Sequence, residues 1–133
     1  MLYQVLGAGC KCVQLSWSDC SDRELLLVAQ QVREITNMYG AQMVMNNRTD
    51  IAIAVKADAV HLGQQDMCWK EARKMIPSSM KIGLTLDNPD QFDSQAVDYF
   101  GIGPVFKTVT KPQDTDLFGL QGIEEVRKLT NKP

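Results

Sequence analysis

Apolar residues along the chain follow two patterns, a helical repeat in some segments and short continuous runs in others. The clearest helical repeat covers residues 25–35, where apolar positions recur at steps of three and four. Ser21 and Glu24 precede it with the spacing of a capping box, and Gly40 follows where a left-handed residue can end a helix. This pattern predicts a helix that begins after Ser21 and ends near Gly40.

Short apolar runs and helical segments alternate over the rest of the chain. The predicted strands are residues 11–15, 42–45, 57–62, 81–84 and 97–102. The other predicted helices are residues 49–55, 69–76 and 120–129, with a further start at Asn88-Pro89. Because most of these strands are continuous apolar runs, they indicate a parallel sheet covered by helices on at least one side. The 133 residues contain no linker and are expected to form a single α/β domain.

Charge and hydropathy exclude several classes of partner. The chain has 14 basic and 16 acidic residues and no basic run, which does not favour nucleic acid or an anionic membrane surface. No apolar run approaches the length of a membrane span. The first fifteen residues lack the pattern of a secretion signal, so we expect a cytoplasmic protein.

The four cysteines have spacings typical of neither a zinc or redox pair nor a disulfide framework. We therefore expect free thiols. Cys10 and Cys12 are two residues apart near a predicted strand start, and we expect both to be buried. A single histidine cannot build a His-rich metal site.

Polar residues follow every predicted strand, where chemistry gathers in parallel α/β sheets. The last of these segments, residues 103–112, combines Thr108 and Thr110 with Lys111. Two hydroxyls and a cation suit a phosphate group, although such a loop is also common as a solvated connection. The whole stretch of residues 104–119 has no predicted structure, and we interpret it as a candidate lid.

Asp66 is the one carboxylate placed directly after a predicted strand. It could hold a magnesium ion that also contacts a phosphate. It could equally cap the helix predicted from Trp69. Sequence spacing does not separate these two interpretations.

Four segments taken in order, residues 13–15, 46–48, 60–66 and 101–112, resemble the thiamine-phosphate synthase family. The resemblance covers essentially the whole chain. It implies a (β/α)₈ TIM barrel, here an incomplete barrel of about five parallel βα units forming one partial domain over residues 1–133. By the family pattern the chain starts inside the first helix and stops before the seventh strand, so we expect truncation at both ends. Open sheet edges would then allow homo-oligomers to form.

The resemblance also implies a transferase of thiamine biosynthesis. Family members join hydroxymethylpyrimidine diphosphate to thiazole phosphate, with magnesium, and release diphosphate and thiamine phosphate. The implied roles are aminopyrimidine recognition by Gln14, diphosphate contacts by Asn46, Thr85 and Lys111, magnesium binding by Asp66 and Asn47, and thiazole phosphate binding by Thr108 and Thr110. Lys111 would be the catalytic cation, and His61 would be structural.

The chain departs from the family pattern at three positions. Ser16 and Ser18 stand where the family has two cations, and Asn47 replaces an aspartate. Fewer charges predict weaker diphosphate and magnesium binding, which leaves catalysis by this chain open. One alternative is a non-catalytic phosphate-binding or regulatory relative. Another is a thiazole tautomerase-like protein, although the histidine of such enzymes falls at Asp87 here.

Overall fold

Five parallel strands form one sheet in the computed structural model, which describes residues 1–93, 97–107 and 117–133. Their order in the sheet is their order in the chain, β1 (Cys12–Leu15), β2 (Gln42–Asn46), β3 (Ala59–Leu62), β4 (Lys81–Leu86) and β5 (Tyr99–Ile102). The helices are α1 (Leu2–Gly7), α2 (Asp22–Met38), α3 (Thr49–Val55), α4 (Trp69–Met75) and α5 (Gly119–Leu129), with a 3₁₀ turn η1 (Pro89–Gln91). The expected strand positions and parallel pairing are therefore confirmed.

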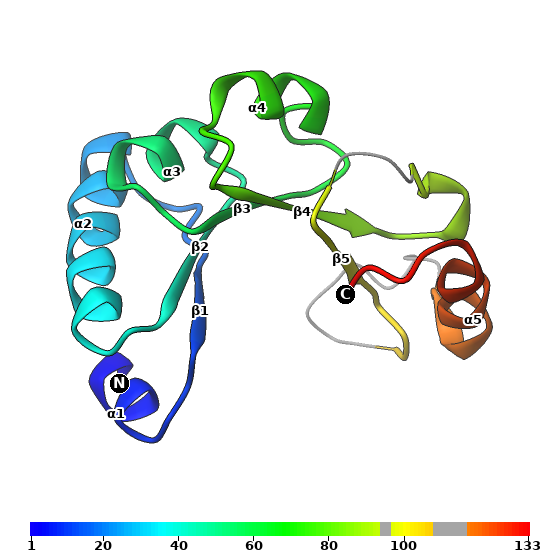
Figure 1. Ribbon diagram of the computed structural model, residues 1–133, viewed down its shortest axis with the longest axis horizontal. Coiled ribbons are helices and arrows are strands. Elements are labelled where there is room, and N and C mark those ends of the chain that lie inside the picture. Colours follow the sequence, from blue (N-terminus) through cyan, green and yellow to red (C-terminus); the bar gives the residue numbers. More distant parts are fainter. Residues whose placement is uncertain (94–96, 108–116) are drawn as a thin grey trace.

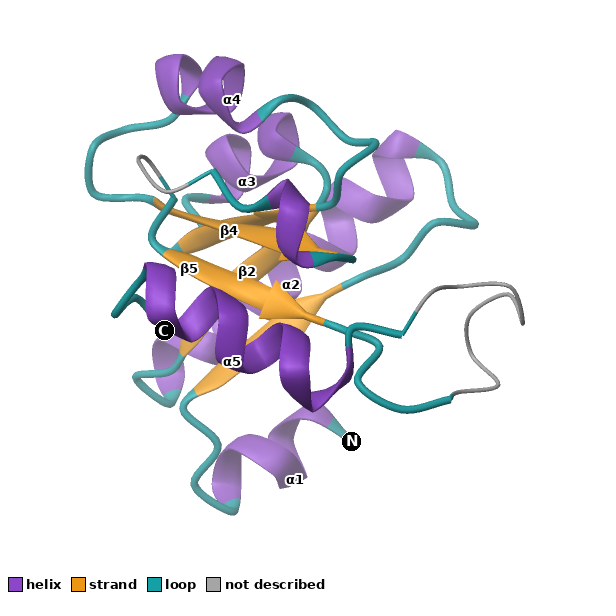
Figure 2. Cartoon of the chain, turned by 90° about the vertical axis from the view of Figure 1, so that its right-hand side faces the viewer, coloured by secondary structure: helices purple, strands orange, loops and turns teal. Residues whose placement is uncertain are grey.

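The sheet curves, and α2, α3 and α4 lie on its outer side (Figure 1). Viewed from the β5 end, α5 lies beside that edge strand (Figure 2). Successive βα units that add a strand on one side and a helix outside are the repeat of a TIM barrel. The expected incomplete barrel of about five units is confirmed. Within the described residues, no helix has both the length and the apolar character needed to cross a membrane.

The longest helix, α2, begins and ends where local sequence predicts. The hydroxyl of Ser21 accepts a hydrogen bond from the Glu24 N–H at 3.3 Å, and the Glu24 carboxylate accepts one from the Ser21 N–H at 2.9 Å. These two bonds are the capping box. Gly40 has a φ of +59° directly after the helix, a conformation that glycine adopts without strain.

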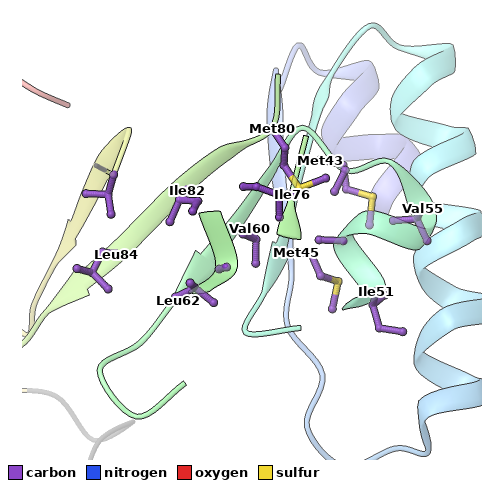
Figure 3. Close-up of a cluster of buried hydrophobic side chains, with 14 of the residues drawn as sticks. Met43, Met45, Ile51, Val55, Val60, Leu62, Ile76, Met80, Ile82 and Leu84 are labelled. Atoms are coloured by element: carbon purple, nitrogen blue, oxygen red, sulfur yellow. The ribbon is translucent and has the colours of Figure 1, made fainter. Parts of the chain in front are cut away.

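The core lies between the sheet and the outer helices. Alternate strand residues point to this side, including Met43, Met45, Val60, Leu62 and Ile82, all at most 1% exposed (Figure 3). Ile51 and Val55 of α3 pack against them. The remaining strand residues point to the inner, concave side, which is where polar side chains gather.

Several local expectations differ from the structure. Helix α1 was implied only by the family pattern, because Leu6 is its one buried residue and no helical repeat marks it. The helix expected at Asn88 is a single 3₁₀ turn without a side-chain cap. Burial of the thiols at the first strand was wrong, since Cys12 is exposed and Cys10 half-buried, because β1 is an edge strand and the inner face is open. All four cysteines are free, as expected.

Candidate active site on the inner face of the sheet

One row of the sheet brings four inner-face residues side by side. The strand register pairs Asn46 with His61, His61 with Gly83, and Gly83 with Tyr99. Their side chains therefore share the concave face, near the carboxyl ends of β2 and β3. A hollow of about 590 Å³ on the same face is lined in part by Gln14 and Tyr99, but most of its lining, including Gln42 and Lys81, lies at the amino ends of the strands.

Gln14 and Asn46, two of the expected substrate-binding residues, are in direct contact. The Gln14 amide nitrogen donates to the Asn46 side-chain oxygen at 2.7 Å. The Asn46 amide nitrogen in turn donates to the hydroxyl of Ser16 at 3.3 Å. Ser16, which stands in place of a family cation, thus supports Asn46 through a neutral hydrogen bond.

His61 is surrounded by hydroxyl groups on the inner face. Its Nε2 lies 2.8 Å from Thr85 Oγ1, and its Nδ1 lies 3.2 Å from the Tyr99 hydroxyl. Gly83 and Gly101 make room for this arrangement. A Cβ at Gly83 would lie 2.1 Å from the Tyr99 ring and 2.5 Å from His61 Nδ1, and a Cβ at Gly101 would lie 2.8 Å from the imidazole.

Burial sets the protonation states of His61 and Tyr99. His61 is 9% exposed, and burial lowers the pKa of its imidazole more than the nearby Asp66 carboxylate raises it. Burial, with smaller contributions from Cys12 and Asp98, raises the pKa of Tyr99 to about 12. At neutral pH the imidazole is therefore neutral and the phenol is protonated.

Asp66 stabilises the turn after β3 and does not cap α4. Its carboxylate accepts a hydrogen bond from the Gly63 N–H at 2.6 Å, and its own N–H donates to the Gly63 carbonyl at 3.2 Å. The N-cap of α4 is Cys68, without a side-chain bond, so the capping interpretation was wrong. Asp66 lines a separate hollow of about 320 Å³ with Gln64 and Lys70.

The expected metal residues follow neighbouring strands. Asn47 is exposed with a φ of +64°, and its N–H donates to the His61 carbonyl at 2.8 Å, which holds it at the end of β3. No cluster of three or more His, Cys, Asp or Glu side chains occurs in the described part of the chain. Asp66 and Asn47 offer a carboxylate and an amide oxygen, the hard ligands that Mg²⁺ prefers. Asp66, however, lines its own hollow, and its carboxylate already accepts from the Gly63 N–H.

The hydroxyl-rich loop leaves from the carboxyl end of β5. The Gly103–Pro104 peptide bond is cis, and the Pro104 carbonyl accepts from the Phe118 N–H at 2.8 Å. The two ends of the loop are thus joined beside the site. Thr108, Thr110 and Lys111, together with most of the candidate lid, lie outside the described residues.

Comparison with known proteins identifies the family of this chain. The family model described as thiamine monophosphate synthase matches residues 1–133. The chain belongs to this family. It is 35% identical over 128 residues to the thiamine-phosphate synthase of Albidiferax ferrireducens, covering 94% of the chain and 58% of that protein. It is likewise 35% identical over 131 residues to the thiamine-phosphate synthase of Clostridium novyi, covering 96% of the chain and 64% of that protein.

A solved member of the thiamine monophosphate synthase family has the same fold. Thiamine phosphate pyrophosphorylase from Pyrococcus furiosus superposes with a TM-score of 0.86 at 27% identity, covering 99% of this chain and 64% of the other. The chain therefore spans roughly three fifths of the length of these relatives. The relatives named here are synthases, which favours neither the tautomerase nor the regulatory alternative.

Two residues of the site were not assigned from the thiamine monophosphate synthase pattern. Tyr99 contacts His61, and the Gln64 amide donates to the Thr85 carbonyl at 2.5 Å, joining the turn after β3 to β4. Gly83 leaves room for the Tyr99 ring, but only the strand register shows that the two residues are neighbours. Gln64 had no signal beyond its place after a strand.

Proposed function

We propose that this chain acts in thiamine biosynthesis as the diphosphate-binding part of a thiamine-phosphate synthase. Its substrates are hydroxymethylpyrimidine diphosphate and thiazole phosphate, and its products are thiamine phosphate and diphosphate. The main support for the proposal is the hydrogen bond between Gln14 and Asn46. It joins the residue expected to recognise the pyrimidine to a residue expected to contact the diphosphate. Both belong to a chain that matches the family model throughout.

The reaction needs a stabilised leaving group and two aligned substrates. The bond between the pyrimidine methylene carbon and the diphosphate oxygen breaks, and the thiazole nitrogen bonds to that carbon. No side chain needs to act as a nucleophile. Asn46, Thr85 and Lys111 bind diphosphate oxygens, and Thr108 and Thr110 bind the thiazole phosphate. Orientation and charge stabilisation of this kind supply most of the catalysis in phosphate chemistry.

Magnesium is the proposed cofactor, held by Asp66 and Asn47 together with substrate oxygens. When bound, it neutralises charge on the departing diphosphate. Asn47 brings an oxygen without a charge, so the affinity for magnesium is lower than for a pair of carboxylates. Gln14 orients the pyrimidine beside the diphosphate.

A turnover assay tests the proposed function. The chain is mixed with both substrates and magnesium, and thiamine phosphate is measured by chromatography. We expect product, and we expect Lys111→Ala to remove most of the rate, since one charge-assisted contact contributes about 1.5 to 3 kcal/mol, or roughly 10- to 150-fold.

Lys107→Ala is the matched control for this assay, because Lys107 is an exposed cation in the same loop. Equal rates for the Lys111→Ala and Lys107→Ala variants would contradict the role of Lys111. Tight binding of hydroxymethylpyrimidine diphosphate without any product would instead indicate the non-catalytic relative.

Self-association through the open sheet edges is part of the proposal. The outer edge of β1 has no neighbouring strand within the described residues. Unpaired strand edges favour pairing with another chain. A second copy of this chain is the proposed partner.

A further inference from the structure

The direction of the hydrogen bonds around His61 decides what the Thr85 hydroxyl offers to a ligand. A neutral imidazole carries one proton, on either Nδ1 or Nε2. If Nε2 carries it, Thr85 Oγ1 accepts from His61 and its own proton is free to donate. If Nδ1 carries it, Thr85 donates to Nε2 and its proton is already used. The two tautomers thus give hydroxyls of opposite polarity at the end of β4.

The Tyr99 contact favours one of the two tautomers. A phenol O–H is a better donor than an imidazole N–H, and an imidazole nitrogen is a better acceptor than a phenol oxygen. His61 is the one hydrogen-bond partner of the Tyr99 hydroxyl among the described residues. The Tyr99 O–H therefore donates to Nδ1, which places the imidazole proton on Nε2.

We propose that His61 is a positioning residue: held by Tyr99 in the tautomer with the proton on Nε2, it turns the Thr85 hydroxyl into a hydrogen-bond donor toward an anion. Packing supports this assignment. His61 and Tyr99 meet across Gly83, where any Cβ would collide with both, and the His61 ring is closed in by Gly101 on the other side. The ring is thus confined between two strands, and Thr85 is held from its backbone by Gln64 at 2.5 Å.

The expected ligand is the diphosphate of the proposed function, and this part of the inference rests on that function. A phosphate oxygen accepts hydrogen bonds and cannot donate them when ionised. A hydroxyl fixed as a donor therefore suits it, whereas a hydroxyl that already donates to His61 does not. The tautomer itself does not depend on the identity of the ligand.

Nitrogen NMR of the intact chain tests the tautomer directly. His61 is the only histidine, so a sample labelled with ¹⁵N-histidine gives signals from this ring alone. We expect the proton on Nε2 in the unliganded protein at neutral pH. A proton on Nδ1 would overturn the proposal.

The Tyr99→Phe variant tests whether the Tyr99 hydroxyl selects the His61 tautomer, because it removes only the hydroxyl and leaves the ring over Gly83. We expect a mixture of both tautomers in this variant. An unchanged single tautomer would show that Tyr99 does not hold His61. If the variant does not fold, the wild-type spectrum still decides where the proton lies.

Titration with inorganic diphosphate tests the consequence for Thr85. We expect Thr85→Val to weaken binding about tenfold, and His61→Leu to weaken it similarly, while His61→Gln keeps a donor near Oγ1 and retains most of the affinity. Equal affinity for the Leu and Gln variants would overturn the positioning role. If wild-type chain with the proton on Nε2 does not bind diphosphate, the proposed function fails and the assignment of His61 as the hydrogen-bond donor to Thr85 stands.

Discussion

Residues on the inner face of the sheet differ in kind from those on the outer face. Outward positions of β2, β3 and β4 are apolar and buried, whereas inward positions include Gln14, Asn46, His61 and Thr85. Each of these four side chains meets another of them at hydrogen-bond distance. Such prearranged side chains can bind a polar ligand without first reorganising.

The Gln14→Leu substitution tests pyrimidine recognition at this scale. It removes the amide that contacts Asn46 while keeping a similar volume on an exposed position of β1. We expect about 2- to 12-fold weaker binding of hydroxymethylpyrimidine diphosphate, since a net hydrogen bond contributes about 0.5 to 1.5 kcal/mol. The measurement is isothermal titration calorimetry.

Gln42→Leu is the matched control, because Gln42 is also exposed, lines the same hollow as Gln14 and begins β2 at the opposite end of the strand from Asn46. Its affinity should equal that of the wild type. Equal losses in both variants would show that Gln14 has no specific role.

Gly83→Ala tests the close approach of Tyr99 and His61. The added methyl would lie 2.1 Å from the Tyr99 ring, so the ring must move. Overpacking of this kind costs about 1 to 3 kcal/mol of the free energy of unfolding. Urea unfolding should show this loss. In a Tyr99→Ala background, Gly83→Ala should cost less of the free energy of unfolding, because the ring is no longer there to be displaced. A single variant as stable as the wild type would contradict the described packing.

At the scale of elements, two aspartates make the same pair of contacts, one to a backbone N–H of the neighbouring strand and one to an arginine of a helix. Before β3, the Asp58 carboxylate accepts from the Met43 N–H at 2.7 Å and pairs with Arg33 of α2 at 2.5 Å. Before β5, Asp98 accepts from the Ile82 N–H at 2.7 Å and pairs with Arg73 of α4 at 2.6 Å. Each aspartate thus ties a helix and the start of the neighbouring strand to its own strand.

The second of these contacts predicts a pH dependence of stability. Burial alone would raise the pKa of Asp98, but the hydrogen bonds from Ile82 and Arg73 lower it overall. A carboxyl with a lowered pKa in the folded state stabilises the protein above its unfolded pKa, about 3.9, and this contribution is lost as pH falls through the folded pKa. Asp98→Asn should therefore cost about 1 kcal/mol near pH 7, a modest value because the pair is partly exposed, and less in acid.

Asp19→Asn is the control for that series, since Asp19 is an exposed carboxylate without a hydrogen bond in the described structure. Chemical unfolding measured from pH 7 down to about pH 3 covers the window. If the gap between Asp98→Asn and wild type stayed constant with pH, the carboxylate would not be the stabilising group.

Helices and strands were largely predictable because their signals are local. The capping box at Ser21 and the apolar runs of the strands determine where these elements begin, and the structure agrees within a few residues. Contacts across strands were harder to predict, because they depend on register. Nothing near Tyr99 in the chain indicates that it lies two strands from His61 with Gly83 between them.

The residue pattern grouped Gln14 and Asn46 at one end of the sheet, because both follow predicted strands, and the family resemblance added their expected roles. The resemblance did not indicate the place of Asp66, whose carboxylate bonds the Gly63 backbone and lines a different hollow. Side-chain direction after a strand depends on the turn that follows. The roles of Thr108, Thr110 and Lys111 stay predictions.

At the scale of the whole molecule, five βα units form a curved sheet with two edge strands. The edges differ. On the β5 side, the Phe100 N–H donates to the Pro133 carbonyl at 2.9 Å, so the segment after α5 already occupies part of that edge, whereas β1 pairs only with β2 among the described residues. The β1 edge is therefore the better candidate for pairing with a second chain.

Sedimentation velocity over a wide range of concentrations tests this association. We expect a reversible shift from monomer to dimer as the concentration rises. Cys12→Pro should shift the equilibrium toward monomer, since proline cannot donate to a ladder. The Cys12 N–H faces the open edge, because the residue before it, Lys11, bonds β2 through the Gln42 N–H and alternate residues of a parallel strand face opposite neighbours. A monomer at every concentration would contradict pairing through the edge.

Binding of hydroxymethylpyrimidine diphosphate tests the central claim most directly. In calorimetric titrations of this chain with magnesium present, we expect saturable binding of one ligand per chain that weakens when magnesium is chelated. Thermal unfolding should shift upward under the same conditions, because a ligand that binds only the folded state stabilises it. A cooperative unfolding transition that does not move, together with no heat of binding, would contradict the assignment of a diphosphate site to the inner face of the sheet.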